Sequence, residues 1–234
     1  YSDNKEYNKA IESYEKAIKI NPEDSGAYNN LGITYSDNKE YNKAIESYEK
    51  AIKINPEDSG AYNNLGITYS DNKEYNKAIE SYEKAIKINP EDSGAYNNLG
   101  ITYSDNKEYN KAIESYEKAI KINPEDSNAY INLFELELIV GKSKNQKLHK
   151  NYISHIRKSN ESLFQYDMLN ILRNIAEDKN VDIKKLLIKY NNETLEDWCF
   201  ENLDSWKLKQ KETVKNKLNL AINELKLKLK KTNN

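Results

Sequence analysis

Apolar side chains recur with a helical period through the first half of the chain, in two stretches separated by short polar breaks. In residues 25–58 the apolar positions are Ala27, Tyr28, Leu31 and Tyr35, then Tyr41, Ala44, Ile45, Tyr48, Ala51 and Ile52. The polar segment Asp37-Asn38-Lys39 predicts a tight turn between two helices. Asn55-Pro56 ends the second helix, because proline disfavours helical geometry in the residue before it. We therefore expect a hairpin of two amphipathic helices, with Ser25 as the N-cap of the first.

This unit recurs every 34 residues without change, since residues 1–93 are identical to residues 35–127. Full copies span 25–58, 59–92 and 93–126, a truncated copy spans 1–24, and a degenerate half unit spans 127–141. One hairpin cannot bury its own apolar face, so each copy has to stack on its neighbours. The pattern predicts an all-α solenoid over residues 1–126. Because Tyr1 falls inside a unit, we expect the sequence to be part of a longer chain.

The unit resembles the tetratricopeptide repeat in its 34-residue period and in the residue types at the positions that characterise that family. The residues that carry the resemblance are Tyr28, Leu31-Gly32, Tyr35, Ala44, Tyr48, Ala51 and Pro56. Lys39 stands where many members of that family have a turn glycine. Gly32 and Ala44 are small, which permits close approach of the two helices. The resemblance implies a right-handed superhelical solenoid of helix-turn-helix repeats with a concave groove lined by the first helix of each unit.

Composition changes where the repeats end. The whole chain is 37% hydrophobic with a net charge of −2, but residues 1–126 hold 16 lysines against 24 acids, and residues 127–234 hold 20 basic residues against 14 acids. We expect residues 142–234 to form a separate C-terminal helical domain, a bundle that caps the array. Its last helix, residues 206–231, is basic and amphipathic. Within each repeat, Glu46–Lys50 and Glu49–Lys53 have the spacing of i,i+4 ion pairs.

Candidate chemistry is sparse. A single cysteine, Cys199, excludes a disulfide framework, and His149 and His155 lie six residues apart, which places them on different faces of a helix. No phosphate-binding loop or nucleophile motif is present. We therefore expect no enzymatic activity, no cofactor and no metal site. No apolar run is long enough to span a bilayer, and the cytoplasm is the expected location.

The remaining candidate for function is the groove that the resemblance implies, with a peptide or partner protein bound along it. Its predicted residues form three identical sets: Asn29, Asn30, Ile33, Ser36, Asp37; Asn63, Asn64, Ile67, Ser70, Asp71; and Asn97, Asn98, Ile101, Ser104, Asp105. The asparagines either bind a peptide backbone or satisfy local backbone groups. The groove lacks the cations with which some family members clamp a chaperone's C-terminal carboxylate, so a neutral or basic partner is favoured.

Two alternatives stay open at this point. The basic C-terminal domain could act as a sensor or effector that contacts another protein, a membrane or nucleic acid, although its scarcity of arginine makes the last two unexpected. The repeats could also self-assemble end to end through the truncated helix Tyr1–Ile20, whose apolar stripe has no hairpin partner.

Overall fold

The computed structural model describes residues 3–140, and within that range the chain forms eight α-helices joined by short turns. The helices are α1 (Asp3–Ile20), α2 (Ser25–Asp37), α3 (Tyr41–Ile54), α4 (Ser59–Asp71), α5 (Tyr75–Ile88), α6 (Ser93–Asp105), α7 (Tyr109–Ile122) and α8 (Ser127–Val140). Contacts divide the chain into two compact units, Tyr1–Pro124 and Glu125–Asn234. Helices α1 to α7 belong to the first unit and α8 to the second.

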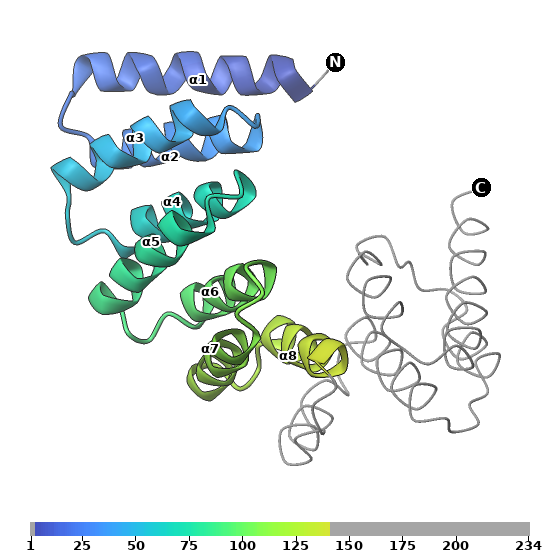
Figure 1. The fold of residues 1–234 in the computed structure, drawn as a ribbon. Coiled ribbons are helices and arrows are strands. Elements are labelled where there is room, and N and C mark those ends of the chain that lie inside the picture. The colour runs from blue at the N-terminus through green and yellow to red at the C-terminus, as the bar shows by residue number, and fades with distance from the viewer. Residues whose placement is uncertain (1–2, 141–234) are drawn as a thin grey trace, which may run out of the picture. The chain divides into compact units, whose positions relative to one another are not determined.

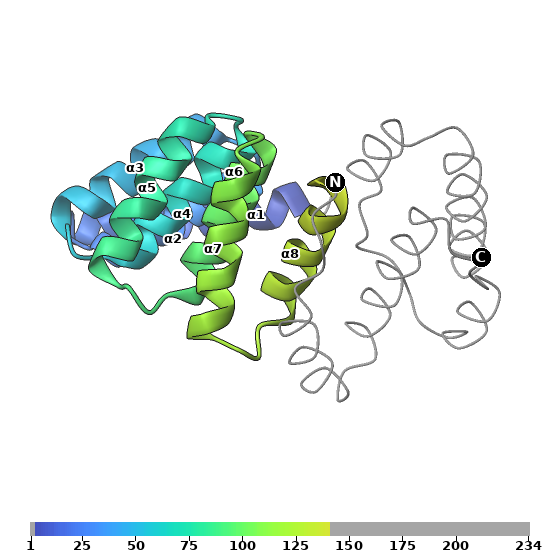
Figure 2. The same ribbon diagram turned by 60° about the horizontal axis from the view of Figure 1, so that its bottom comes forward.

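Helices α1 to α7 stack in chain order, and their axes turn progressively along the stack (Figure 1). We call α2, α4 and α6 the A helices, and α3, α5 and α7 the B helices. Each A helix packs against the B helix of its own repeat and against the B-type helix before it, and α4 also contacts both other A helices. Figure 2 shows the B helices following one another along the stack. The expected all-α array of tandem helix-turn-helix repeats is confirmed.

Two finer expectations are not decided by this architecture. The right-handed sense of the superhelix stays a prediction. The C-terminal bundle, with His149, His155, Cys199 and the basic helix at 206–231, lies outside the described residues.

The core of each repeat forms where the two helices come closest. Tyr48 is 1% exposed and Ala44 and Ala51 are fully buried. The ring of Tyr48 lies on the backbone of α2 at Gly32, where a Cβ atom would come 2.6 Å from a ring carbon. Glycine is required because any side chain would meet the ring, and the expected close approach at Gly32 is confirmed.

The N-cap of each A helix is the aspartate before the predicted serine, so the assignment of Ser25 as N-cap is wrong by one residue. Asp24 has an extended backbone, and its carboxylate accepts a hydrogen bond from the backbone N–H of Ala27 at 2.9 Å. Asp58 and Asp92 cap α4 and α6 in the same way. The carboxylate also interacts favourably with the positive end of the helix dipole.

The turn between A and B helices falls where the sequence predicts it, and it places a lysine in the left-handed region of backbone space. Lys39 has φ 60°, and Lys73 and Lys107 have φ 62° and 63°. The backbone N–H of Lys39 bonds to Ser36 O and that of Glu40 to Tyr35 O, each at 2.8 Å. This is the bonding pattern of a Schellman motif, which most often has glycine at the lysine's position.

Helix α8 begins with an A-helix-like sequence and then departs from it. Phe134 stands at the place of the repeat glycine and is buried, with its ring centroid 5.9 Å from that of Tyr130. Within the described residues the Oε1 atom of Glu135 is buried without a hydrogen-bond partner. Burial raises the pKa of this carboxyl to about 7, because the charged form loses its hydration.

Candidate protein-binding face

The residues predicted to line a groove all lie on the A helices, which run side by side through the first unit. We call the surface that they form the A-helix face. Ile33 and Ile101 are 36% and 37% exposed, and the other exposed large hydrophobic residue in the described range is Ile20, the last residue of α1. Asn30, Asp37, Asp71 and Asp105 are exposed, and the other predicted residues are half-buried.

The asparagines of this face join neighbouring A helices. The Nδ2 of Asn64 donates to the Oδ1 of Asn29 at 3.2 Å, and Asn98 donates to Asn63 at the same distance. These asparagine rungs use one donor or one acceptor of each amide, and an asparagine side chain offers two donors and an acceptor with two lone pairs. Asn29, Asn63, Asn64 and Asn98 therefore have a structural role between repeats, and these bonds use only part of the hydrogen-bonding capacity of their amides.

A chain of hydroxyl groups forms a second link between the same helices. The hydroxyls of Ser36 and Thr68 are 3.0 Å apart, and Thr102 donates to Ser70 at 3.0 Å. Thr68 is also hydrogen-bonded to the buried hydroxyl of Tyr48, where burial raises the pKa to about 12. The threonines are buried and were missed by sequence reasoning. Their signal was a β-branched hydroxyl four residues after an asparagine, the spacing at which threonine bonds a helical carbonyl.

The aspartates give the face its charge. Among the residues of the A helices, Asp37, Asp71 and Asp105 are the only ones that carry a formal charge. Partial desolvation raises the pKa of Asp71 and Asp105, although both side chains reach solvent. The pKa rises because the charged form of each carboxyl has lost part of its hydration to the protein around it.

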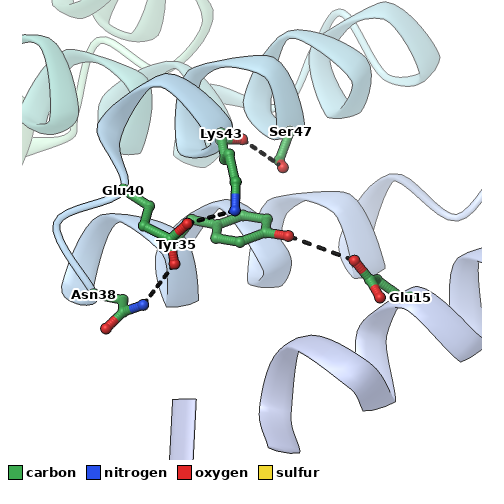
Figure 3. A network of polar contacts seen from close by, with 6 residues as sticks. All are labelled: Glu15, Tyr35, Asn38, Glu40, Lys43 and Ser47. Atoms are coloured by element: carbon green, nitrogen blue, oxygen red, sulfur yellow. Dashed lines mark hydrogen bonds and ion pairs between the residues drawn. The ribbon is translucent and has the colours of Figure 1, made fainter. Parts of the chain in front are cut away.

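A different polar network covers the junction between successive repeats (Figure 3). Glu40 pairs with Lys43 at 2.5 Å and accepts from the amide of Asn38. The Lys43 ammonium lies 5.2 Å from the ring centroid of Tyr35, and the Tyr35 hydroxyl donates to Glu15 at 3.5 Å. The hydrogen bond from Lys43 lowers the pKa of Glu40, and burial raises that of Tyr35.

The i,i+4 ion pairs expected within the B helices do not form. Lys50, the expected partner of Glu46, instead lies 5.7 Å from the ring centroid of Tyr28 on the neighbouring A helix. The same arrangement joins Lys84 to Tyr62 and Lys118 to Tyr96. Attraction to an aromatic face competes with an exposed ion pair because both are weak at a surface.

An open depression lies at the turn edge of the array. It is lined by Lys73, Glu74, Tyr75, Asn76, Lys77 and Asn106. None of these was predicted as a site residue, and Glu74 and Lys77 already pair with each other at 2.6 Å.

The described part of the chain offers little for other chemistry. In residues 3–140 no group of three or more histidine, cysteine, aspartate or glutamate side chains is arranged to hold a metal ion. No helix in that range is both long and apolar enough to cross a bilayer.

Three adjacent hairpins with one shared face define a helical repeat protein, and comparison with known proteins identifies the kind. The family model described as "Tetratricopeptide repeat" matches residues 25–58, 59–92 and 93–126, and one described as "TPR repeat" matches residues 1–39. The chain belongs to the tetratricopeptide repeat family, whose repeats serve protein interaction. No match was found among curated proteins.

Several solved structures share the fold. A crystal structure of MamA is 30% identical with a TM-score of 0.59, and the match covers 68% of this chain and 92% of that one. A second MamA crystal structure is also 30% identical, with a TM-score of 0.57 and coverage of 68% and 86%. MamA from Desulfovibrio magneticus RS-1 is 21% identical, with a TM-score of 0.59 and coverage of 66% and 88%, and shows likeness of fold alone.

Proposed function

We propose that the A-helix face binds a segment of a partner protein, so that the chain acts as an interaction scaffold. The observation that carries this proposal is the row formed by Ile33, Ile67 and Ile101, one aliphatic side chain per repeat, with Ile33 and Ile101 exposed. Beside the row lie the asparagine rungs, which hold the A helices in register and keep amide groups at the surface. A preorganised surface of this kind loses little entropy when it binds a ligand.

The partner is a protein or an extended peptide. Nucleic acid is disfavoured at this face because the A helices carry no lysine or arginine to contact phosphates. The alternative of an effector function in residues 142–234 and that of self-association through α1 stay predictions, and neither draws support from the A-helix face.

Site-specific photocrosslinking in the full chain tests the proposal. A photoreactive amino acid replaces Ile67 at the centre of the row, and the matched control replaces Glu80, which is exposed on B helix α5. This design leaves the asparagine rungs intact, whereas alanine at Asn29 or Asn63 would break them. We expect crosslinks from position 67 to one defined segment of a partner, mapped by mass spectrometry. Equal crosslinking from positions 67 and 80, or none from 67, would refute the proposal.

A further inference from the structure

Each A helix ends on an aspartate with which no lysine of the described residues forms an ion pair, although the hydroxyls of Tyr48 and Tyr82 interact with Asp37 and Asp71. Asp37, Asp71 and Asp105 are the last residues of α2, α4 and α6. Within the described residues none of the three carboxylates takes part in an ion pair or hydrogen bond. A carboxylate at a helix C-terminus is unfavourable because it meets the negative end of the helix dipole. The same cost is therefore present in all three repeats, and a cation at this position would relieve it.

An aliphatic side chain accompanies each aspartate. Ile33, Ile67 and Ile101 lie four residues before Asp37, Asp71 and Asp105, so each isoleucine and its aspartate share one side of the helix about 6 Å apart along its axis. Every repeat thus presents the same pair of features, an apolar contact beside an unpaired anion. Lysine and arginine combine an aliphatic stem with a cationic head, which matches that pair.

The spacing of the pairs favours one backbone conformation in the ligand. Packed helices lie about 8–10 Å apart, and the asparagine rungs between α2, α4 and α6 indicate direct packing of this kind. A polyproline II helix has three residues per turn and advances about 9 Å per turn. Every third side chain of such a segment would therefore meet the next A helix.

We propose that the A-helix face recognises an extended segment in polyproline II conformation with a lysine or arginine at every third position. Each cation pairs with one of Asp37, Asp71 and Asp105, and its stem or a neighbouring aliphatic residue contacts the isoleucine of the same repeat. The inference rests on the proposed function and specifies its partner. Partial desolvation of Asp71 and Asp105 supports it, because a cation pairs more strongly with a carboxylate that has already lost part of its hydration.

Two synthetic peptides of equal composition test the inference by fluorescence anisotropy with the full chain. The periodic peptide is three copies of Lys-Pro-Val, and the clustered peptide has three lysines followed by three copies of Pro-Val. The test variant carries Asp37→Asn, Asp71→Asn and Asp105→Asn. Its matched control carries Glu46→Gln, Glu80→Gln and Glu114→Gln, which removes the same charge from exposed positions on the B helices.

We expect the periodic peptide to bind the unchanged chain several-fold more tightly than the clustered one. The aspartate variant should lose about ten-fold in affinity, since three exposed pairs each contribute a few tenths to one kcal/mol, and the control should lose less than about two-fold. Absent binding of the periodic peptide, equal binding of both peptides, or equal loss in the two variants would overturn the inference. Crosslinks from position 67 would then still support the proposed function, because they do not depend on lysine spacing.

Discussion

Helix α1 and helix α3 share a sequence and differ in environment. Residues 3–20 and 37–54 are identical, yet Tyr48 is 1% exposed whereas its counterpart Tyr14 is half-buried. The difference arises because α3 packs between two A helices, α2 and α4, whereas among the described helices α1 contacts only α2 to this extent. The extent to which the apolar stripe is buried therefore depends on the helices that pack against it.

The same pair of segments differs in backbone conformation. The residues Asp-Asn-Lys-Glu at 3–6 are helical in α1. At 37–40 they end α2, form the turn with φ 60° at Lys39 and reach the N-cap position of α3 at Glu40, whose side chain makes no capping bond. One tetrapeptide thus adopts two structures within the described residues, a helix at 3–6 and a helix end followed by a turn at 37–40. Local propensity permits both, and packing of the hairpin selects the turn.

The largest expected effect is a contrast between two tyrosine truncations. Tyr82→Ala in α5 removes a ring that is 1% exposed and a hydroxyl bonded to Thr102, and should cost about 3–5 kcal/mol of unfolding free energy. Tyr14→Ala removes the same ring from α1 and should cost about 1 kcal/mol or less. Urea unfolding followed by circular dichroism measures both. Equal losses would show that α1 and α5 are packed alike in solution.

A side chain added where the two helices of a repeat approach most closely should reduce the packing of that repeat, so that its B helix is less buried, as α1 is. Gly66→Ala places a Cβ atom 2.6 Å from the ring of Tyr82 and should cost about 1–3 kcal/mol. Gly60→Ala is the control, because its Cβ meets only the Asp58 carboxylate, at 3.2 Å. Alanine also has a higher helix propensity than glycine, by about 1 kcal/mol or less. Thermal unfolding separates the two variants. A neutral Gly66→Ala would mean that the close approach is not needed.

The features predicted from the sequence are those set within one repeat. Helical period, the turn at Asp37-Asn38-Lys39 and the close approach at Gly32 follow from spacing and side-chain size, and the 34-residue identity carries them to every copy. The N-cap was misplaced because Asp24 and Ser25 are adjacent and both residue types cap helices well.

The features that were missed depend on geometry between helices. The bond from Asn64 to Asn29 joins positions 35 residues apart, and Lys50 prefers the Tyr28 ring to Glu46 because another helix brings that ring near. Neither contact can be predicted from the spacing of residues along a single helix. The sequence therefore placed the candidate residues on one helix of each repeat but did not predict the bonds among them. Their role in binding a partner stays a prediction.

Replacing the same lysine of the repeat by glycine should stabilise the protein in the hairpin turn and destabilise it in α1. Lys73→Gly relieves a left-handed residue with φ 62° and should stabilise the array by about 0.5–1 kcal/mol. Lys5→Gly falls inside helical α1 and should destabilise by up to about 1 kcal/mol. Lys73→Ala removes the same ammonium but keeps Cβ, and should give no gain. Chemical denaturation of the three variants decides the matter, and destabilisation by Lys73→Gly would contradict the role of the turn.

The smallest expected effect is a change in how stability decreases at acidic pH. The hydrogen bond from Lys77 lowers the pKa of Glu74 below its usual 4.5. A lowered pKa in the folded state contributes stability above pH 4.5, and that contribution is lost as the pH falls through the folded-state pKa. Glu74→Gln should therefore flatten the loss of stability between pH 5 and pH 3. Glu6→Gln in α1 is the comparison variant, because it removes a carboxylate from a longer pair, at 3.8 Å between Glu6 and Lys9 against 2.6 Å between Glu74 and Lys77. Asp71 and Asp105, whose pKa values burial raises, contribute in the opposite direction, so the comparison uses differences between variants at each pH. Identical acid profiles for the two glutamate variants would show that the hairpin turn does not strengthen this pair.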